Sequence, residues 1–462
     1  MNRELQNMSE ESLQNLEEIV EMELLTVEDI RNRLDVTEKG KIRQSIQNCK
    51  YALEHDPCLK GAICRNEMTC QIDIMKKMPW KRRGVHMTDT DMNNLALYLE
   101  KNYGLTSDRV ITKAIDIVAN ENSFHPILEY LESLKWDGIP RIQHMLTHFF
   151  GAEDIDYTGE VMKMHMMGAI RRLYEPGAKY DIMLCLVGGQ GAGKSTFFRL
   201  LAVRDEWFSD DLRKLDDDNV YRKLQGHWII EMSEMMATAN AKSIEEIKSF
   251  LSRQKEVYKI PYETHPADRP RQCVFGGTSN ALDFLPLDRS GNRRFIPVMV
   301  YPEQAEVHIL EDEAASRAYI GQMWAEAMEI YKSGRFKLAF SPAMQRYLKE
   351  HQRDFMPEDT KAGMIQAYLD KYTGNMVCSK QLYKEALNHA FDEPKQWEIR
   401  EINEIMNQCI SGWRYFQNPR MFSEYGRQKG WERENPATDS GNPSEKTMDG
   451  FVEVTEQMEL PF

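Results

Sequence analysis

The sequence has 462 residues, of which 42% are hydrophobic and 29% charged, and its formal net charge at pH 7 is −14. This length exceeds one ordinary hydrophobic core, so two or three domains are expected, and the composition is that of a soluble globular protein. The acidic balance excludes a protein coated with nucleic acid over its whole surface, but it leaves room for a narrow basic channel or a basic module.

Apolar runs and cysteines indicate the compartment. The sequence has no apolar run long enough to span a bilayer, and its N-terminus lacks the apolar core of a signal peptide. The eight cysteines are scattered without a C-x-x-C pair, which favours reduced thiols over a metal cluster. These features predict a cytoplasmic protein with no membrane contact.

The N-terminal part is expected to be mainly helical. Residues 1–40 are polar and acidic and predict a helical arm, either a short amphipathic helix or a partner-binding segment. Residues 41–180 predict a mainly helical N-terminal domain, because apolar residues recur there at helical spacing. Within it, the basic cluster Lys81–Arg83 beside Trp80 is either a nucleic-acid contact or a solvated loop.

A glycine-rich segment then separates an apolar run, Ile182–Val187, from the helix-forming stretch Thr196–Leu201. Its sequence matches the phosphate-binding pattern G-x-x-x-x-G-K-[ST]: Gly188-Gly189-Gln190-Gly191-Ala192-Gly193-Lys194-Ser195. Glycines let successive backbone N–H groups turn toward one anion, and the following helix start adds its positive dipole end. The pattern predicts a site for ATP and Mg²⁺ that includes Thr196. Lys194 would contact the β- and γ-phosphates, and Ser195 would ligate the metal.

Two acidic residues follow the next apolar strand, His227–Glu231. A carboxylate at the end of a strand downstream of a phosphate loop is placed to hold Mg²⁺ and to polarise water. Glu231 is therefore predicted as a metal ligand, and Glu234 as the base that orients the attacking water. The alternative is that either carboxylate is a solvated residue at a strand end.

Further candidates come later in this region, which we assign to the core at residues 181–350. The strand Cys273–Asn280 ends in Asn280, which is suited to sensing the γ-phosphate or its attacking water. Arg293 and Arg294 precede another apolar run and are candidate arginine fingers, supplied to a neighbouring subunit. At least one arginine of this cluster is expected to form a structural ion pair instead.

A β-prone stretch from Tyr258 to Arg271 predicts a hairpin with net positive charge. It either projects from the sheet as a DNA contact or is an ordinary solvated hairpin. The residues predicted to contact DNA phosphates are Lys259, His265, Arg269 and Arg271.

In combination, these motifs resemble the virulence-associated protein E family of bacteriophages, prophages and mobile elements. The resemblance rests on Gly188–Ser195, Trp228–Glu234, Gly277–Asn280 and Gly291–Phe295, and it extends over roughly residues 45 to 435. It implies an α/β P-loop NTPase core of the AAA+ class, similar to superfamily-three helicases, with a mostly parallel sheet. It also implies a ring, expected to be a hexamer, around DNA in a bacterial host. No primase-like segment precedes the core, so a separate primase is expected.

The C-terminal part predicts a small helical, winged-helix-like module at residues 351–433. The stretch from Ser411 to Arg433 contains five basic residues and two acidic ones. This surplus of positive charge fits either DNA contact or protein docking. Residues 434–462 have the composition of a disordered tail. The last residues resemble a peptide that docks on the bacterial sliding clamp, with Gln457, Leu460 and Phe462 as contacts.

Two functions are compatible with this reading. The first is an ATP-hydrolysing, ring-forming DNA helicase or translocase that acts on single-stranded or forked DNA in replication of a mobile element. The second is a nucleotide-gated DNA-binding initiator, loader or regulator without unwinding activity.

Overall fold

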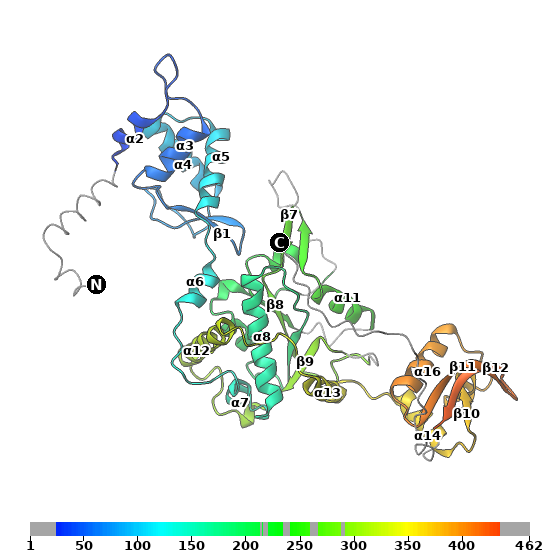
Figure 1. Cartoon of the computed structure of the whole chain (residues 1–462). Helices are drawn as coiled ribbons and strands as arrows, with labels where there is room; N and C mark the ends of the chain where they lie inside the picture. Colours follow the sequence, from blue (N-terminus) through cyan, green and yellow to red (C-terminus); the bar gives the residue numbers. More distant parts are fainter. Residues whose placement is uncertain are drawn as a thin grey trace, which may run out of the picture. The chain divides into compact units, whose positions relative to one another are not determined.

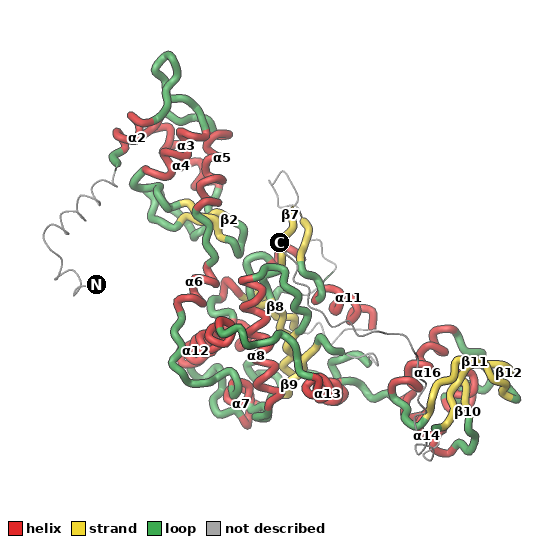
Figure 2. The backbone as a smooth tube through the Cα atoms, in the orientation of Figure 1, coloured by secondary structure: helices red, strands yellow, loops and turns green. Residues whose placement is uncertain are grey.

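The structure is a computed structural model that describes residues 25–212, 215, 220–233, 241–258, 267–287 and 292–434. The chain divides into two compact units. The first contains the residues up to Pro357 apart from Leu287–Gly291, and the second begins at Glu358. The fold is mixed α/β (Figures 1 and 2). Among the residues described, no helix is long and apolar enough to cross a membrane.

The first unit begins with a helical subdomain. Its elements are α2 (Val27–Arg33), α3 (Ile46–His55), α4 (Asp89–Tyr103) and α5 (Asp108–Glu121), with an antiparallel hairpin of β1 (Ile63–Asn66) and β2 (Gln71–Ile74). Thr26 and Thr88 accept backbone N–H bonds at the starts of α2 and α4, which is why these helices begin there. The apolar faces of the helices enclose a hydrophobic cluster that runs from Ile30 to Ala119.

The basic cluster of this subdomain has a structural role at its centre. The Arg82 guanidinium and the Trp80 indole N–H both donate to the buried Asp91 carboxylate, each at 2.9 Å. Lys81 and Arg83 are exposed. Arg82 therefore fixes the loop onto α4, and the solvated-loop alternative fits the cluster better than a nucleic-acid contact.

A five-stranded parallel sheet forms the centre of the first unit. Its strand order is β4-β5-β8-β3-β9, and every neighbouring pair in it is parallel. The strands are β3 (Met183–Val187), β4 (Phe208–Ser209), β5 (Ile229–Ser233), β8 (Val274–Ser279) and β9 (Phe295–Met299). β3 and β8 are buried along their whole length, which explains the continuous apolar sequence of β3.

Helices cover both faces of the sheet. Leu184 and Leu186 of β3 point into the larger cluster, and Met183 and Cys185 point into the other. The larger cluster contains side chains of α6 (Pro126–Ser133), α7 (Met145–Phe150), α8 (Asp156–Tyr174), α9 (Lys194–Leu201), α12 (Glu313–Lys332) and α13 (Pro342–His351). The other contains side chains of α10 (Val220–Leu224), α11 (Ala241–Leu251) and the 3₁₀ turn η4 (Gln352–Phe355). Two further 3₁₀ turns are η2 (Asp205–Trp207) and η3 (Pro302–Gln304).

The hydrophobic clusters place the domain boundaries at other residues than the sequence predicted. Residues 126–180 do not belong with the helical subdomain, because α6, α7 and α8 pack on the sheet. The C-terminal unit begins at Glu358 instead of residue 351, because the Gln352 side-chain amide donates to the backbone oxygens of Asn292 and Phe295 beside β9.

The predicted hairpin is present as an antiparallel pair, β6 (Lys255–Tyr258) with β7 (Ala267–Pro270). Residues 259–266, between the two strands in sequence, lie outside the described residues.

The second unit has the element order helix, strand, helices, strand, strand. Its elements are α14 (Thr360–Lys371), β10 (Met376–Cys378), α15 (Ser379–Gln381), the π-helix η5 (Leu382–Ala386), α16 (Gln396–Gln408), β11 (Trp413–Phe422) and β12 (Gly426–Arg433). The three strands form an antiparallel sheet in the order β10-β12-β11. Trp431 of β12 and apolar side chains of α14 and α16 share one hydrophobic cluster.

Candidate active site at the phosphate loop

The phosphate-loop segment connects β3 to α9 as the sequence predicted. Gly191 and Gly193 have φ angles of +85° and +79°, which side-chain-bearing residues rarely adopt. A Cβ at Gly193 would also lie 2.4 Å from Ile309 Cγ2. Glycine is therefore required at position 193 by both conformation and space.

Lys194 is the first residue of α9, and its side chain folds back over the loop. Its ammonium group donates to the backbone oxygens of Gly188 and Gly189, each at 2.7 Å, and to Asn280 Oδ1 at 3.0 Å. Only 7% of the residue is exposed. Burial lowers the pKa of Lys194, and the carboxylate of Glu231 opposes that shift.

Ser195, Glu231 and Thr278 form a second cluster next to Lys194. One carboxylate oxygen of Glu231 accepts from the Ser195 hydroxyl at 2.7 Å and from the Thr278 hydroxyl at 2.6 Å. Burial raises the pKa of Glu231, while the bonds from Thr278 and Ser195 and the charge of Lys194 lower it. A buried carboxylate beside a serine hydroxyl is an oxygen-donor set that suits Mg²⁺.

The positions of these residues follow from the parallel sheet. The phosphate loop and Asn280 come directly after the carboxyl ends of β3 and β8, and β5 lies on the other side of β8. Carboxyl ends of parallel strands meet at one edge, where ligands of such sheets bind. Glu231 is the third residue of β5, two residues before its end, so it lies deeper than the strand-tip position predicted from the sequence.

A cavity of about 550 Å³ opens at this edge of the sheet. It is lined by residues Gln190–Thr196, Ser233, Thr278–Ala281 and Leu310. His308 Nε2 lies 3.3 Å from the Gly191 oxygen, so the segment after β9 forms one wall. The cavity brings together polar groups from the loop, β5 and β8 in a space of the size that small-molecule sites occupy.

Sequence reasoning assigned no role to two features of this site. The first is Thr278, which lies two residues before Asn280 and therefore on the same side of β8, because side chains alternate along a strand. The available signal was a hydroxyl residue next to the apolar start of this strand. The contact of residues 308–310 with the loop had no signal, because this segment is irregular and more than a hundred positions away.

Arg293 and Arg294 lie near the amino ends of the strands, opposite to the carboxyl ends that carry the phosphate loop. They precede β9, and the Arg294 backbone oxygen accepts from Met183 N at the start of β3. The Arg294 side chain pairs with Asp181 at 3.1 Å, whereas Arg293 is exposed. A five-residue strand is roughly 16 Å long, so neither guanidinium belongs to the phosphate-loop cavity of its own chain.

The remaining predicted site residues fall into two groups. Those outside the described residues are Glu234, Lys259, His265, Gln457, Leu460 and Phe462. Of the others, Arg269 is half-buried on β7. Arg271 is buried, donates to Glu256 through Nε at 2.7 Å and stacks 4.3 Å from the Phe250 ring centre. This position does not suit the DNA phosphate contact predicted for Arg271, because its charge is already matched inside the protein.

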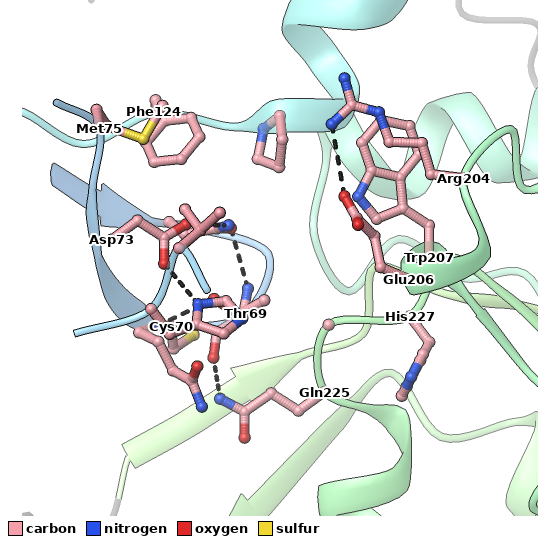
Figure 3. Close-up of a pocket in the computed structure, with 16 residues that line it drawn as sticks. Thr69, Cys70, Asp73, Met75, Phe124, Arg204, Glu206, Trp207, Gln225 and His227 are labelled. Carbon is pink, nitrogen blue, oxygen red and sulfur yellow. Dashed lines mark hydrogen bonds and ion pairs between the residues drawn. The ribbon is translucent and has the colours of Figure 1, made fainter. Parts of the chain in front are cut away.

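A larger cavity of about 940 Å³ lies elsewhere in the first unit, between the β1–β2 hairpin and the segments at residues 204–207 and 225–227 (Figure 3). Its polar side chains interact with one another: Asp73 with His86, and Arg204 with Glu206. The Arg204 guanidinium also lies 4.7 Å from the Trp207 ring centre. Size alone therefore does not identify the site, and the chemistry predicted from the sequence lies at the phosphate loop.

The five-stranded parallel sheet, with a glycine-rich loop and a lysine at its carboxyl edge, defines an α/β core of the nucleotide-binding-like class. Residues 131–357 match the family model of the virulence-associated protein E-like domain. The chain thus carries a domain of that family, and the resemblance predicted from the motifs is confirmed over these residues.

Solved apo structures of the NrS-1 C-terminal region are similar to this chain at 13% identity, covering 81% of this chain and 96% of theirs, with TM-scores of 0.45 and 0.42. No curated protein matches the sequence.

Proposed function

We propose that the chain is an ATP-hydrolysing DNA helicase or translocase that assembles as a ring and acts in replication of a bacteriophage, prophage or mobile element. The observation that carries the proposal is the cluster at the carboxyl edge of the sheet, where Lys194, Ser195 and Glu231 meet beside an open cavity. The virulence-associated protein E-like domain supports the biological context.

The loop residues supply the phosphate contacts in this proposal. An ammonium group has three N–H donors, and Lys194 directs bonds to three oxygens of the protein. To bind the β- and γ-phosphates, Lys194 exchanges one or more of these acceptors for phosphate oxygens. Asn280, released from the lysine, is then free to orient water at the γ-phosphate.

Ser195 and Glu231 are the residues that would hold Mg²⁺. A bound Mg²⁺ would supply positive charge beside the phosphates at these two residues. The Thr278 hydroxyl keeps the Glu231 carboxylate oriented, as outer hydrogen bonds do for ligands in other metal sites. Glu234 is the proposed base.

The position of Arg293 supports the proposed ring arrangement. Since Arg293 is exposed at the sheet edge opposite its own phosphate loop, it can complete a site only in a neighbouring copy. We propose Arg293 as the finger and Arg294 as the structural ion pair. The further partners in this proposal are single-stranded or forked DNA, a separate primase, and the host clamp through the C-terminal tail.

The test is the ATPase rate of the full chain with and without single-stranded DNA, together with its mass in solution. The motor proposal predicts strong stimulation by DNA and the mass of a ring, near six copies. An unstimulated monomer would contradict it and favour the alternative, a nucleotide-gated initiator, loader or regulator.

A further inference from the structure

The β11–β12 hairpin of the second unit has two chemically different faces. Side chains along a strand alternate between faces, and directly paired residues share one. Arg414 pairs with Glu432 in the ladder, and Tyr415 pairs with Trp431. The strands pair again near the turn, where Arg420 is opposite Gln428 and Met421 is opposite Arg427.

On the first face, both arginines are bonded to a carboxylate of the protein. Glu432 accepts from Arg414 at 2.6 Å and from Arg420 at 2.7 Å. Phe416 and Phe422 on the same face are buried in a small cluster with Cys378. Both arginines of this face are therefore engaged with one carboxylate, which offsets one of their two positive charges.

The second face begins with Trp431, which packs into the helical core and donates its indole N–H to Asn407 of α16 at 2.8 Å. Beyond Trp431, toward the turn, the same face of β12 carries Lys429 and Arg427, both exposed. Tyr415 and Met421 of β11 share this face and are 40% and 71% exposed. The Arg427 Nε donates to the Pro419 backbone oxygen, a neutral acceptor.

The charges of the second face have no acidic partner among the residues that the structure describes. Within the described part of the chain, no carboxylate forms an ion pair with Arg427 or Lys429. On α16, the exposed Arg400 and Glu404 cancel in charge. The positive charge of this surface therefore lies on the hairpin and not on the helix.

We propose that the face of the hairpin that carries Arg427 and Lys429 binds the phosphate backbone of DNA. The two cations contact successive phosphates, and Tyr415 and Met421 pack against sugars or bases, as aromatic and apolar side chains do in nucleic-acid interfaces. This adds a DNA contact outside the ATPase core to the function proposed above. A failure of this contact, with turnover intact, leaves that function untouched.

The hairpin offers a matched pair of double variants. Arg427→Ala with Lys429→Ala removes two cations from the second face, and Arg414→Ala with Arg420→Ala removes two from the first. Binding of the full chain to one labelled oligonucleotide, single-stranded and as a duplex, is measured by fluorescence anisotropy between about 50 and 200 mM salt. ATP turnover without DNA, unchanged in both variants, shows that the core remains folded.

We expect the Arg427/Lys429 variant to bind DNA about tenfold more weakly at the lower salt, with the salt slope reduced by roughly 2. The Arg414/Arg420 variant should stay within about twofold, because both guanidinium groups are already bonded to Glu432, which offsets one of their charges. Equal weakening by both variants would overturn the assignment to one face, since it would reflect only net charge. Unchanged DNA binding, with loss of binding to a polyglutamate peptide, would overturn DNA as the ligand.

Discussion

The phosphate-loop site and the β11–β12 hairpin use charge in opposite ways. Lys194 and Glu231 are buried and hydrogen-bond to neighbouring groups of the protein. Arg427 and Lys429 are exposed and have no carboxylate partner among the described residues. A buried charge acts through geometry and low dielectric, so its loss has a large effect that salt hardly changes. An exposed charge acts through its field, so its effects are graded and screened by salt.

Arg293 gives the strongest test of this comparison. Its side chain is exposed in its own chain, but it is proposed to act inside the phosphate-loop site of a neighbouring copy. Arg293→Ala should reduce ATP turnover by about a thousandfold or more without loss of nucleotide binding. Arg294→Ala should instead lower thermal stability through loss of the Asp181 pair. Steady-state turnover and nucleotide affinity of both variants distinguish the two. If Arg294→Ala alone abolished turnover, the assignment would be reversed.

A change within the buried cluster should separate activity from stability. Glu231→Gln keeps an oxygen that accepts from Ser195 and Thr278 but removes the charge, so turnover should fall by about a hundredfold or more. Because burial raises the folded-state pKa of Glu231 above its usual value, the ionised form opposes folding. That cost is absent below the unfolded-state pKa and complete above the folded-state pKa.

Glu231→Gln should therefore unfold at higher denaturant concentration than the wild type at pH 8, with a smaller difference at pH 4. Chemical denaturation at both pH values measures it. A variant less stable than the wild type at pH 8 would show that the carboxylate charge is net stabilising.

Asp91 is a buried charged residue that lies on α4, outside the candidate active site. Burial opposes its ionisation, but bonds from Arg82 and Trp80 outweigh burial and lower its pKa to about 2. Its stabilising contribution is present above the usual pKa and disappears as pH falls from about 4 to 2. Asp91→Asn should destabilise the chain by about 2 kcal/mol at pH 7 and leave ATP turnover unchanged.

The control for Asp91 is Asp116→Asn, which breaks the exposed pair with Arg65 and should cost at most about 1 kcal/mol. Denaturation at pH 7 and pH 3 compares the two variants. An equal loss from both at pH 7 would contradict the importance of burial.

The smallest expected effect comes from Thr278. Thr278→Val removes one of the two hydroxyl donors to Glu231 and should reduce turnover about fivefold to tenfold, since such a bond contributes about 1 kcal/mol. Thr278→Ser keeps the hydroxyl and should remain near the wild-type rate. A serine variant as slow as the valine variant would assign the effect to packing instead.

The sequence predicted the strands at 182–187, 227–231 and 273–280 and their parallel arrangement, because buried parallel strands are recognisable as apolar runs between helices. It did not predict the order β4-β5-β8-β3-β9, since the pairing of strands far apart in sequence is decided by tertiary packing. For the same reason, the helices at residues 126–174 were assigned to the wrong core.

Local patterns predicted the candidate site better than they predicted surface contacts. The motif predicted the loop between β3 and α9, where spacing alone specifies the geometry. Arg271 was predicted as a DNA contact because of its charge. Its partner Glu256 can be identified only when the pairing of β6 with β7 is known. The roles of Arg293 and Arg294 likewise depend on Asp181, which lies 113 positions from Arg294.

The most direct test of the account is binding and hydrolysis of ATP with Mg²⁺ by the full chain and by Lys194→Ala. Lys163→Ala is the control, because Lys163 is paired with Glu160 on α8, outside the cavity. The account predicts that the wild type and the control bind and hydrolyse ATP, while Lys194→Ala loses turnover by more than about a hundredfold. Wild-type turnover in Lys194→Ala, or a wild type that binds no ATP, would contradict it.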